Sequence, residues 1–264
     1  MIHFTKAHAY GNDFVYVLET EVGSRPLDVL ARELCDRHAG IGADGLIVYR
    51  PEGHGASMRL LNADGSRSEV SGNGIRGLAA LLLRNDDRDG GELTIQTEAG
   101  PKQLTRLARD RPDRQTFRAA MGVPRDLRQV SISAAGRTLQ TVVMDFGNPQ
   151  AVVLVDLPDR DQFQRLGAAI ERHDMFPQRT NVEFASVETP DRIRILIWER
   201  GVGPTQSSGT GSCAALIAAA AFGGAARSAD VVAPGGTQRV EWQEDQVYLT
   251  GWAEILFDGD WLRD

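Results

Sequence analysis

Two short stretches of the chain carry residues suited to holding an anion and moving a proton. The stretch "SGNGIRGLAALL" begins at Ser71, and "SGTGSCAALIAA" begins at Ser208, about half the chain later. In each, serine precedes Gly-x-Gly and an Ala- and Leu-rich run that predicts a helix. Serine is a natural N-cap, and glycine lets a backbone approach a ligand closely. The free N–H groups of the first turn, at the positive end of the helix dipole, then form an anion site.

The repetition predicts that the two motifs act together on one ligand. Two such sites facing each other across a cleft could hold one carboxylate, with Ser71 on one side and Ser208 on the other, as in a two-base active site. The alternative is two well-capped buried helices with no ligand. The letters Gly72 to Gly77 also fit the dinucleotide fingerprint G-x-G-x-x-G. That fingerprint needs an apolar strand before it, and the residues here are the polar "NADGSRSEVS".

Asparagine gives a second signal, because an amide both donates and accepts and can hold either end of an amino acid. The chain has six asparagines, and five stand in turn-like contexts: Asn12, Asn62, Asn73, Asn148 and Asn181. Glu199 and Arg200 follow a strongly apolar strand, where a carboxylate could pair with an ammonium and a guanidinium with a carboxylate. Taken singly, these residues also fit ordinary turns and a solvated strand end.

Composition narrows the classes of partner. The net charge of −7 at pH 7 leaves no basic stripe for nucleic acid, so we expect a small-molecule partner. Two cysteines, Cys35 and Cys213, are too few for a disulfide framework and lack metal-ligand spacing, which fits a reducing cytoplasm. The longest apolar run is too short to span a membrane. With Lys6 and Lys102 as its only lysines, the chain has few candidates for a pyridoxal-phosphate site.

The elements around these motifs predict an α+β fold. Short alternating segments such as "DFVYVL", "GLIVYR" and "RIRILIW" predict strands that mostly follow one another, hence largely antiparallel sheets. Helical periodicity covers four ranges: Leu27–Arg37, Gly74–Arg84, Arg160–Arg172 and Gly211–Phe222. The apolar helices predict two pseudo-symmetric halves, each a barrel-like sheet around a central helix.

The halves are predicted to be residues 1–115, with 255–264 able to return to them, and residues 116–254. The polar stretch Thr105–Gln115 is the best candidate for a linker between them.

Eight ordered motifs resemble the diaminopimelate epimerase family over nearly the whole chain. They are "FTKAHAYGNDF", "RHAGIGADGL", "RLLNADGS", "SGNGIRG", "FGNPQAV", "FPQRTNVEF", "WERGVGPTQSSGTGSCAA" and "APGGTQRVEW". The resemblance implies two pseudo-symmetric halves with substrate bound between them. It also implies interconversion of LL- and meso-diaminopimelate, without cofactor or metal, for lysine and peptidoglycan precursor synthesis.

Catalysis in the family uses one cysteine from each half as acid and base on opposite faces of the α-carbon, and these positions fall on Ser71 and Ser208. The residues that match positions holding the remote amino-acid end are Asn12, Asn62, Asn148, Asn181, Glu199 and Arg200. In the family, backbone groups hold the carboxylate at the reacting carbon. By the resemblance, these groups belong to Gly72, Asn73, Gly209 and Thr210.

The two serines keep other functions open, because a serine hydroxyl is a far weaker acid than a thiol and needs a neighbouring base. One alternative is an isomerase or racemase of another amino acid that uses the serine pair. The other is an amino-acid-binding homologue with impaired catalysis. A homodimer is compatible with the sequence, and we expect no nucleic-acid or membrane partner.

Overall fold

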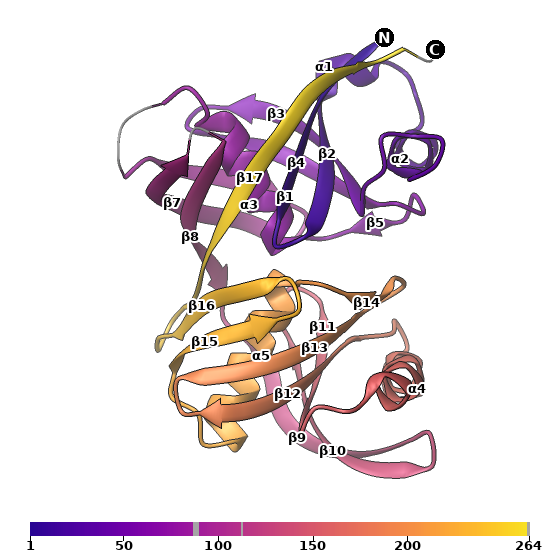
Figure 1. The fold of residues 1–264 in the computed structure, drawn as a ribbon, viewed down its shortest axis with the longest axis vertical. Helices are drawn as coiled ribbons and strands as arrows, with labels where there is room; N and C mark the ends of the chain where they lie inside the picture. The colour runs from indigo at the N-terminus through magenta and orange to yellow at the C-terminus, as the bar shows by residue number, and fades with distance from the viewer. Residues whose placement is uncertain (87–89, 112, 263–264) are drawn as a thin grey trace. The chain divides into compact units, whose positions relative to one another are not determined.

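The computed structural model describes residues 1–86, 90–111 and 113–262, and the chain divides into two compact units (Figure 1). Unit 1 contains Met1–Ala119 and Gly251–Asp264, and unit 2 contains Ala120–Thr250. Strands dominate both units and helices are few, so the predicted α+β class is confirmed.

In unit 1 the strands close into a ring. They are β1 (Ile2–Ala9), β2 (Asn12–Leu18), β3 (Gly45–Glu52), β4 (Gly55–Asn62), β5 (Arg67–Ser68), β6 (Glu92–Thr97), β7 (Gly100–Arg111), β8 (Arg114–Gly122) and the Gly251–Trp261 part of β17 (Val247–Trp261). Pairing runs β17–β1–β2–β3–β4–β6–β7–β8 and returns from β8 to β17. The β2–β3 and β4–β6 pairs are parallel, whereas β1–β2, β3–β4, β6–β7 and β7–β8 are antiparallel.

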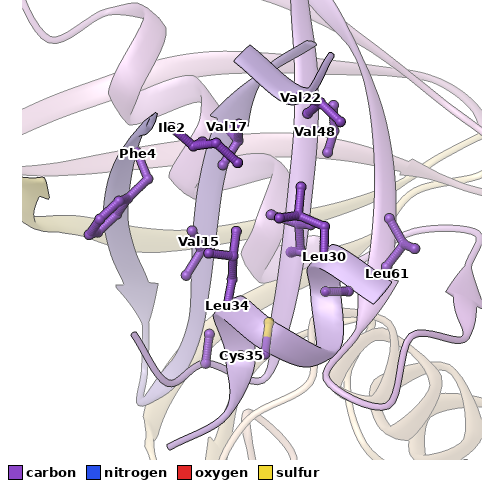
Figure 2. Packing of buried hydrophobic residues seen from close by; sticks show 13 residues of the cluster. Ile2, Phe4, Val15, Val17, Val22, Leu30, Leu34, Cys35, Val48 and Leu61 are labelled. Atoms are coloured by element: carbon purple, nitrogen blue, oxygen red, sulfur yellow. The ribbon is translucent and has the colours of Figure 1, made fainter. Parts of the chain in front are cut away.

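Helix α3 (Gly72–Leu82) lies on the inner side of these strands. Its residues are buried from Gly72 to Ala80, and it contacts β1, β2, β6 and β7. The short α1 (Glu19–Val22) and α2 (Leu27–Cys35) pack on the other face. Figure 2 shows Leu30 and Leu34 of α2 beside Val15 and Val17 of β2. The strand β2 is therefore covered on both faces, which explains its nearly continuous apolar sequence.

Unit 2 repeats this order. Its strands are β9 (Arg125–Ala134), β10 (Arg137–Asp145), β11 (Pro149–Leu154), β12 (Asn181–Thr189), β13 (Arg192–Glu199), β14 (Gly203–Thr205), β15 (Ser228–Ala233), β16 (Gly236–Trp242) and the first residues of β17. Pairing runs β9–β10–β11–β12–β13–β15–β16–β17, with β11–β12 and β13–β15 parallel. The parallel pairs thus occupy the same places in the order as in unit 1.

Two helices cover the faces of this second sheet. Helix α5 (Gly209–Phe222) is buried from Gly209 to Ala219 and contacts β11, β12, β13, β15 and β16. Helix α4 (Arg160–Glu171) packs Phe163 and Leu166 on the opposite face, in one cluster with Phe184. Each unit therefore has one apolar inner helix that begins directly after a serine of the repeated motif.

The linker predicted over Thr105–Gln115 is wrong. Apart from residue 112, which lies outside the described residues, this stretch forms the end of β7 and the start of β8, which pair as an antiparallel hairpin. Two of its polar residues are buried: Arg106 donates to Leu83 O at 3.1 Å, and Gln115 donates to Ala80 O at 3.0 Å. They bond carbonyl groups at the end of α3, which have no partner within the helix.

The close approach of α3 to β2 depends on Gly77. A Cβ atom there would lie 2.0 Å from the hydroxyl oxygen of Tyr16, which is buried and donates to Gly74 O at 3.0 Å. We expect Gly77→Ala to lower the free energy of unfolding by about 1–3 kcal/mol, because overpacking outweighs the gain in helix propensity. Chemical denaturation measures this.

Tyr16→Phe supplies the control, because it removes the atom nearest to the new methyl group. In that background Gly77→Ala should cost less than in the natural protein. An alanine variant as stable as the natural protein would contradict this account of the α3–β2 contact.

Candidate functional site

Ser71 begins α3 as its N-cap. Its backbone is extended, and its Oγ accepts a hydrogen bond from Gly74 N at 3.0 Å. The side chain is half-buried, whereas Gly72 and Asn73 after it are buried. The capping role predicted from sequence is confirmed at this position.

Ser208 begins α5 in the same way. Its Oγ accepts from Gly211 N at 3.1 Å and lies 3.4 Å from Thr210 Oγ1. Ser212 donates to Ser208 O at 2.8 Å. The two serines therefore hold equivalent places in the two units, each half-buried at the start of an inner helix.

The second glycine of each motif makes room for a side chain from the strand beneath. A Cβ at Gly74 would lie 2.7 Å from Ile47 Cδ1, and a Cβ at Gly211 would lie 2.6 Å from Glu183 Oε1. In β3, Gly45 pairs with Phe14, and Ile47 follows two residues later. In β12, Asn181 pairs with Gln150, and Glu183 likewise follows two residues later. Ile47 and Glu183 are thus equivalent positions of the repeat, one apolar and one acidic.

In unit 1 a chain of side-chain hydrogen bonds joins two of the predicted site residues. Asn73 Nδ2 donates to Asn12 Oδ1 at 3.0 Å, and Asn12 Nδ2 donates to Asp44 Oδ2 at 2.7 Å. Arg76, fully buried, donates to Asn73 Oδ1. Asn62 ends β4 and donates instead to Ser66 Oγ at 2.9 Å.

Asp44 and its neighbours were not among the predicted site residues. Arg37 contacts one oxygen of Asp44 and one of Asp13, each at 2.8 Å, and buried Lys6 contacts Asp13 at 2.6 Å. Burial favours the neutral carboxyl of Asp13, but hydrogen bonds from Arg37 and Lys6 outweigh it and lower its pKa. This ion network fixes the strand end that carries Asn12.

In unit 2 the predicted residues gather at the ends of β11, β12 and β13. Asn181 accepts from Arg200 N at 2.9 Å and donates to Pro149 O at 3.1 Å. Glu199 ends β13 beside this residue, because Val182 pairs with Trp198. Asn148 contacts Gln150 at 2.7 Å. Thr210 lies 3.3 Å from the same amide of Gln150, which links this group of residues to the start of α5.

Glu183, like Asp44, is not among the site residues that the sequence predicts. It is fully buried, and burial first, then the charge of Glu199, raises its pKa well above the usual range. The signal in the sequence is an acid inside the apolar run "NVEFA". Val182 and Phe184 point to the α4 side, so strand alternation puts Glu183 on the α5 side.

Other candidate chemistry is limited in the part of the chain that the structure describes. Both cysteines are buried, Cys213 within α5 and Cys35 at the end of α2. Burial raises the pKa of the Cys35 thiol to about 12, so this thiol stays protonated at neutral pH. Among residues 1–86, 90–111 and 113–262, no three His, Cys, Asp or Glu side chains cluster in a way that could hold a metal ion. Within the same ranges, no helix combines the length and the apolar character needed to cross a membrane.

Comparison with known families gives a match that spans both units. Residues 4–125 and 142–256 match the family model described as diaminopimelate epimerase. The diaminopimelate epimerase of Desulforudis audaxviator is 39% identical over 282 residues, covering 99% of this chain and 100% of that protein. That of Pelotomaculum thermopropionicum is 37% identical over 280 residues, covering 98% and 99%.

Solved structures share the fold at low sequence identity. A probable proline racemase from Agrobacterium radiobacter aligns over 100% of this chain and 94% of its own, with a TM-score of 0.78 and 19% identity. A predicted epimerase from Pseudomonas aeruginosa aligns over 100% of both chains, with a TM-score of 0.77 and 12% identity. These likenesses concern the fold.

Proposed function

Because this chain belongs to the diaminopimelate epimerase family, we propose that it interconverts LL- and meso-diaminopimelate by proton transfer at one α-carbon, without a cofactor. The observation that carries the proposal is the family match across both units, with relatives of that name aligned over nearly their full length. Inversion at a carbon requires one group to remove a proton and another to deliver one to the opposite face. The duplicated helix starts supply two equivalent candidates.

Ser71 and Ser208 are the proposed acid and base. Support comes from their equivalent caps, since each Oγ already accepts a backbone N–H of a first helical turn. The same donors would stabilise negative charge on that oxygen during proton removal. The proposed reaction therefore uses hydroxyls, which are far weaker acids than thiols, and we expect it to be slow.

Substrate binding is proposed for residues around these helix starts. Backbone groups of Gly72, Asn73, Gly209 and Thr210 would hold the carboxylate at the reacting carbon, supported by their burial in the first turns of α3 and α5. Polar side chains at strand ends would hold the remote amino-acid end; these are Asn12, Asn62, Asn148, Asn181, Glu199 and Arg200.

The remaining proposals concern the class of substrate, the cell compartment and the partners of the protein. A small-molecule substrate fits membership of an epimerase family. We propose that the protein works in the cytoplasm as a homodimer. We also propose that it has no nucleic-acid partner, because the net charge of −7 disfavours binding to phosphates.

The serine pair favours a second candidate, an amino-acid-binding protein that turns nothing over, because hydroxyls satisfy the geometry but not the acidity. Incubation with meso-diaminopimelate in heavy water separates the two. We expect deuterium to appear at an α-carbon together with the LL isomer, both detected by mass spectrometry and chiral chromatography.

A Ser71→Ala/Ser208→Ala variant is the control, since it removes both hydroxyls. Binding of diaminopimelate without deuterium uptake by the natural protein, over incubations of days, would establish the binding-protein alternative instead.

A further inference from the structure

Glu171 is a buried acid at the last position of α4, and the proposed reaction does not yet use it. Its side chain is only 4% exposed. A carboxylate at the end of a helix meets the negative pole of the helix dipole, and its burial is costly unless it is hydrogen-bonded. The residue therefore does not serve the helix that carries it, and its partners are informative.

Both carboxyl oxygens of Glu171 accept hydrogen bonds from the end of β13 and the turn after it. Oε2 accepts from Trp198 Nε1 at 2.8 Å, and Oε1 accepts from Gly201 N at 3.0 Å. Arg179 Nη1 lies 3.6 Å from Oε1 and supplies a partly exposed opposite charge. An indole N–H and a backbone N–H can only donate, so this position needs a side chain with two accepting atoms.

The turn after β13 carries two of the proposed binding residues. Val202 N donates to Glu199 O at 3.0 Å, which closes a β-turn with Arg200 and Gly201 at its centre. Gly201 has a φ of +77°, which the third position of a type II turn requires and which glycine adopts at little cost. The closing bond does not use the N–H groups of the two central residues, so these groups depend on acceptors outside the turn.

Side chains from two other elements supply those acceptors. Asn181, at the start of β12, accepts from Arg200 N at 2.9 Å, and Glu171 accepts from Gly201 N. The two acceptors are themselves joined through the backbone, because Thr180 N donates to Glu171 O at 3.3 Å. Glu171 therefore ties the end of α4 both to the start of β12 and to the turn after β13.

Apolar packing fixes the strand on which this turn stands. Helix α4 contacts β12, β13 and β14 (Figure 1). A Cβ atom at Gly167 would lie 2.7 Å from the ring of Trp198, so helix and strand approach closely there. The ring of Phe163 meets the same indole edge to face, with 6.0 Å between centroids. The hydrogen bond from Gly201 to Glu171 thus extends a rigid contact from the strand into its turn.

We propose that Glu171 is a positioning residue for the subsite that binds the remote amino-acid end of diaminopimelate. By accepting from Gly201 N, it holds the turn in one conformation, from which Glu199 and Arg200 present their side chains. A turn that is ordered before binding spares the ligand the entropic cost of ordering it. This role deepens the proposed function and rests on Glu199 and Arg200 contacting that end of the substrate.

Unit 1 holds its equivalent turn by a backbone contact. After β4, Gly65 N donates to Asn62 O at 2.9 Å, so the turn is closed in the same way. Its second residue, Ala63, donates its N–H to Asp44 O at 3.0 Å, where unit 2 uses the side chain of Asn181. The turn in unit 2 is therefore held by side chains, and a single substitution can loosen it.

Glu171→Met tests the role, because methionine has a similar length and accepts no such hydrogen bonds. We expect its affinity for meso-diaminopimelate, measured by isothermal calorimetry, to fall about 3- to 30-fold, since the turn must then be ordered on binding. In α-hydrogen exchange KM should rise with little change in kcat. Glu171→Gln keeps one accepting oxygen and should lie between.

Ile170→Val is the matched control, because it removes one methyl group from the neighbouring buried position of α4. It should lower the melting temperature without changing the affinity. In an Arg200→Ala background, Glu171→Met should cost less affinity than in the natural protein, because part of its effect passes through that guanidinium. A loss of affinity that Ile170→Val reproduces, or full additivity with Arg200→Ala, would overturn the inference.

A readout on the free protein separates this inference from the proposed function. Hydrogen exchange of Gly201 N–H, followed by nuclear magnetic resonance, should be faster by about 10-fold or more in Glu171→Met and unchanged in Ile170→Val. Equal exchange in Glu171→Met and the natural protein, or equal affinities, would overturn the inference and leave the proposed function standing. Protection of Gly201 without any binding of diaminopimelate by the natural protein would refute the proposed function, while the hold of Glu171 on the turn would stand.

Discussion

Replacement of Ser71 and Ser208 together by cysteine is expected to raise α-hydrogen exchange of diaminopimelate by about 10²-fold or more, the scale of general acid–base catalysis. A free thiol titrates near a pKa of about 8.5, and a helix N-terminus lowers that value further. Both positions offer such a terminus, with Gly74 N and Gly211 N donating to the capping oxygen. Exchange in heavy water, followed by mass spectrometry, measures the gain.

Each single replacement should do much less. A thiolate that removes the α-proton completes an inversion only if a matched acid delivers a proton to the other face. The Ser71→Cys and Ser208→Cys proteins are therefore the controls, and the excess of the double variant over their combined effects reports cooperation. Because sulfur is a poorer cap than oxygen, thermal melts should first confirm that both helices still form.

Two results would contradict this account. One is a double-cysteine protein that binds diaminopimelate normally and still exchanges nothing. The other is rapid exchange by the natural serines, which would mean that a stronger base stands beside a hydroxyl and activates it. In unit 2 Glu183 would become the first group to investigate by substitution.

The fold followed from local sequence patterns to a large extent. Helices predicted over Leu27–Arg37 and Arg160–Arg172 match α2 and α4 closely. The inner helices α3 and α5 begin two residues earlier than periodicity indicated, at Gly72 and Gly209. The reason is that glycine carries no periodic signal, whereas the capping serine marks the true start.

Segments in which arginine replaces apolar residues were harder to predict. The high charge of "TRLARDRPDRQ" predicts a linker, whereas the residues belong to the β7–β8 hairpin. The polar residues Arg106 and Gln115 can be buried in this hairpin because they donate to carbonyl groups at the end of α3. Inward polar residues of this kind have no signature in a single strand, because their partners are distant in sequence.

The sequence indicates candidate site residues where a residue type implies its own chemistry. Amides in turns and serines before glycines stood out, and Asn12 with Asn73 indeed form one hydrogen-bonded group. Glu183 and Asp44 were missed because their importance depends on what the strand alternation and the first turn of a helix put next to them.

Truncation of Arg200 to alanine is expected to weaken binding of diaminopimelate by about 1.5–3 kcal/mol, the worth of a hydrogen bond to a charged group. The position supports a specific test because Arg200 N, not its side chain, makes the 2.9 Å contact with Asn181 Oδ1. Alanine keeps that backbone contact, so the loss would report the guanidinium. Isothermal calorimetry with meso-diaminopimelate should show an affinity lower by about 10- to 100-fold.

Arg194→Ala is the matched control, since it removes the same charge from β13, the strand that Arg200 directly follows. Arg194 is exposed and pairs with Glu188 at 2.6 Å, away from the end of β13. Its loss should leave the affinity unchanged, because an exposed ion pair contributes little. Arg200→Lys should fall between, as lysine keeps the charge but lacks the planar pair of donors that matches a carboxylate. Equal affinities for Arg200→Ala and the natural protein would remove Arg200 from the proposed binding residues.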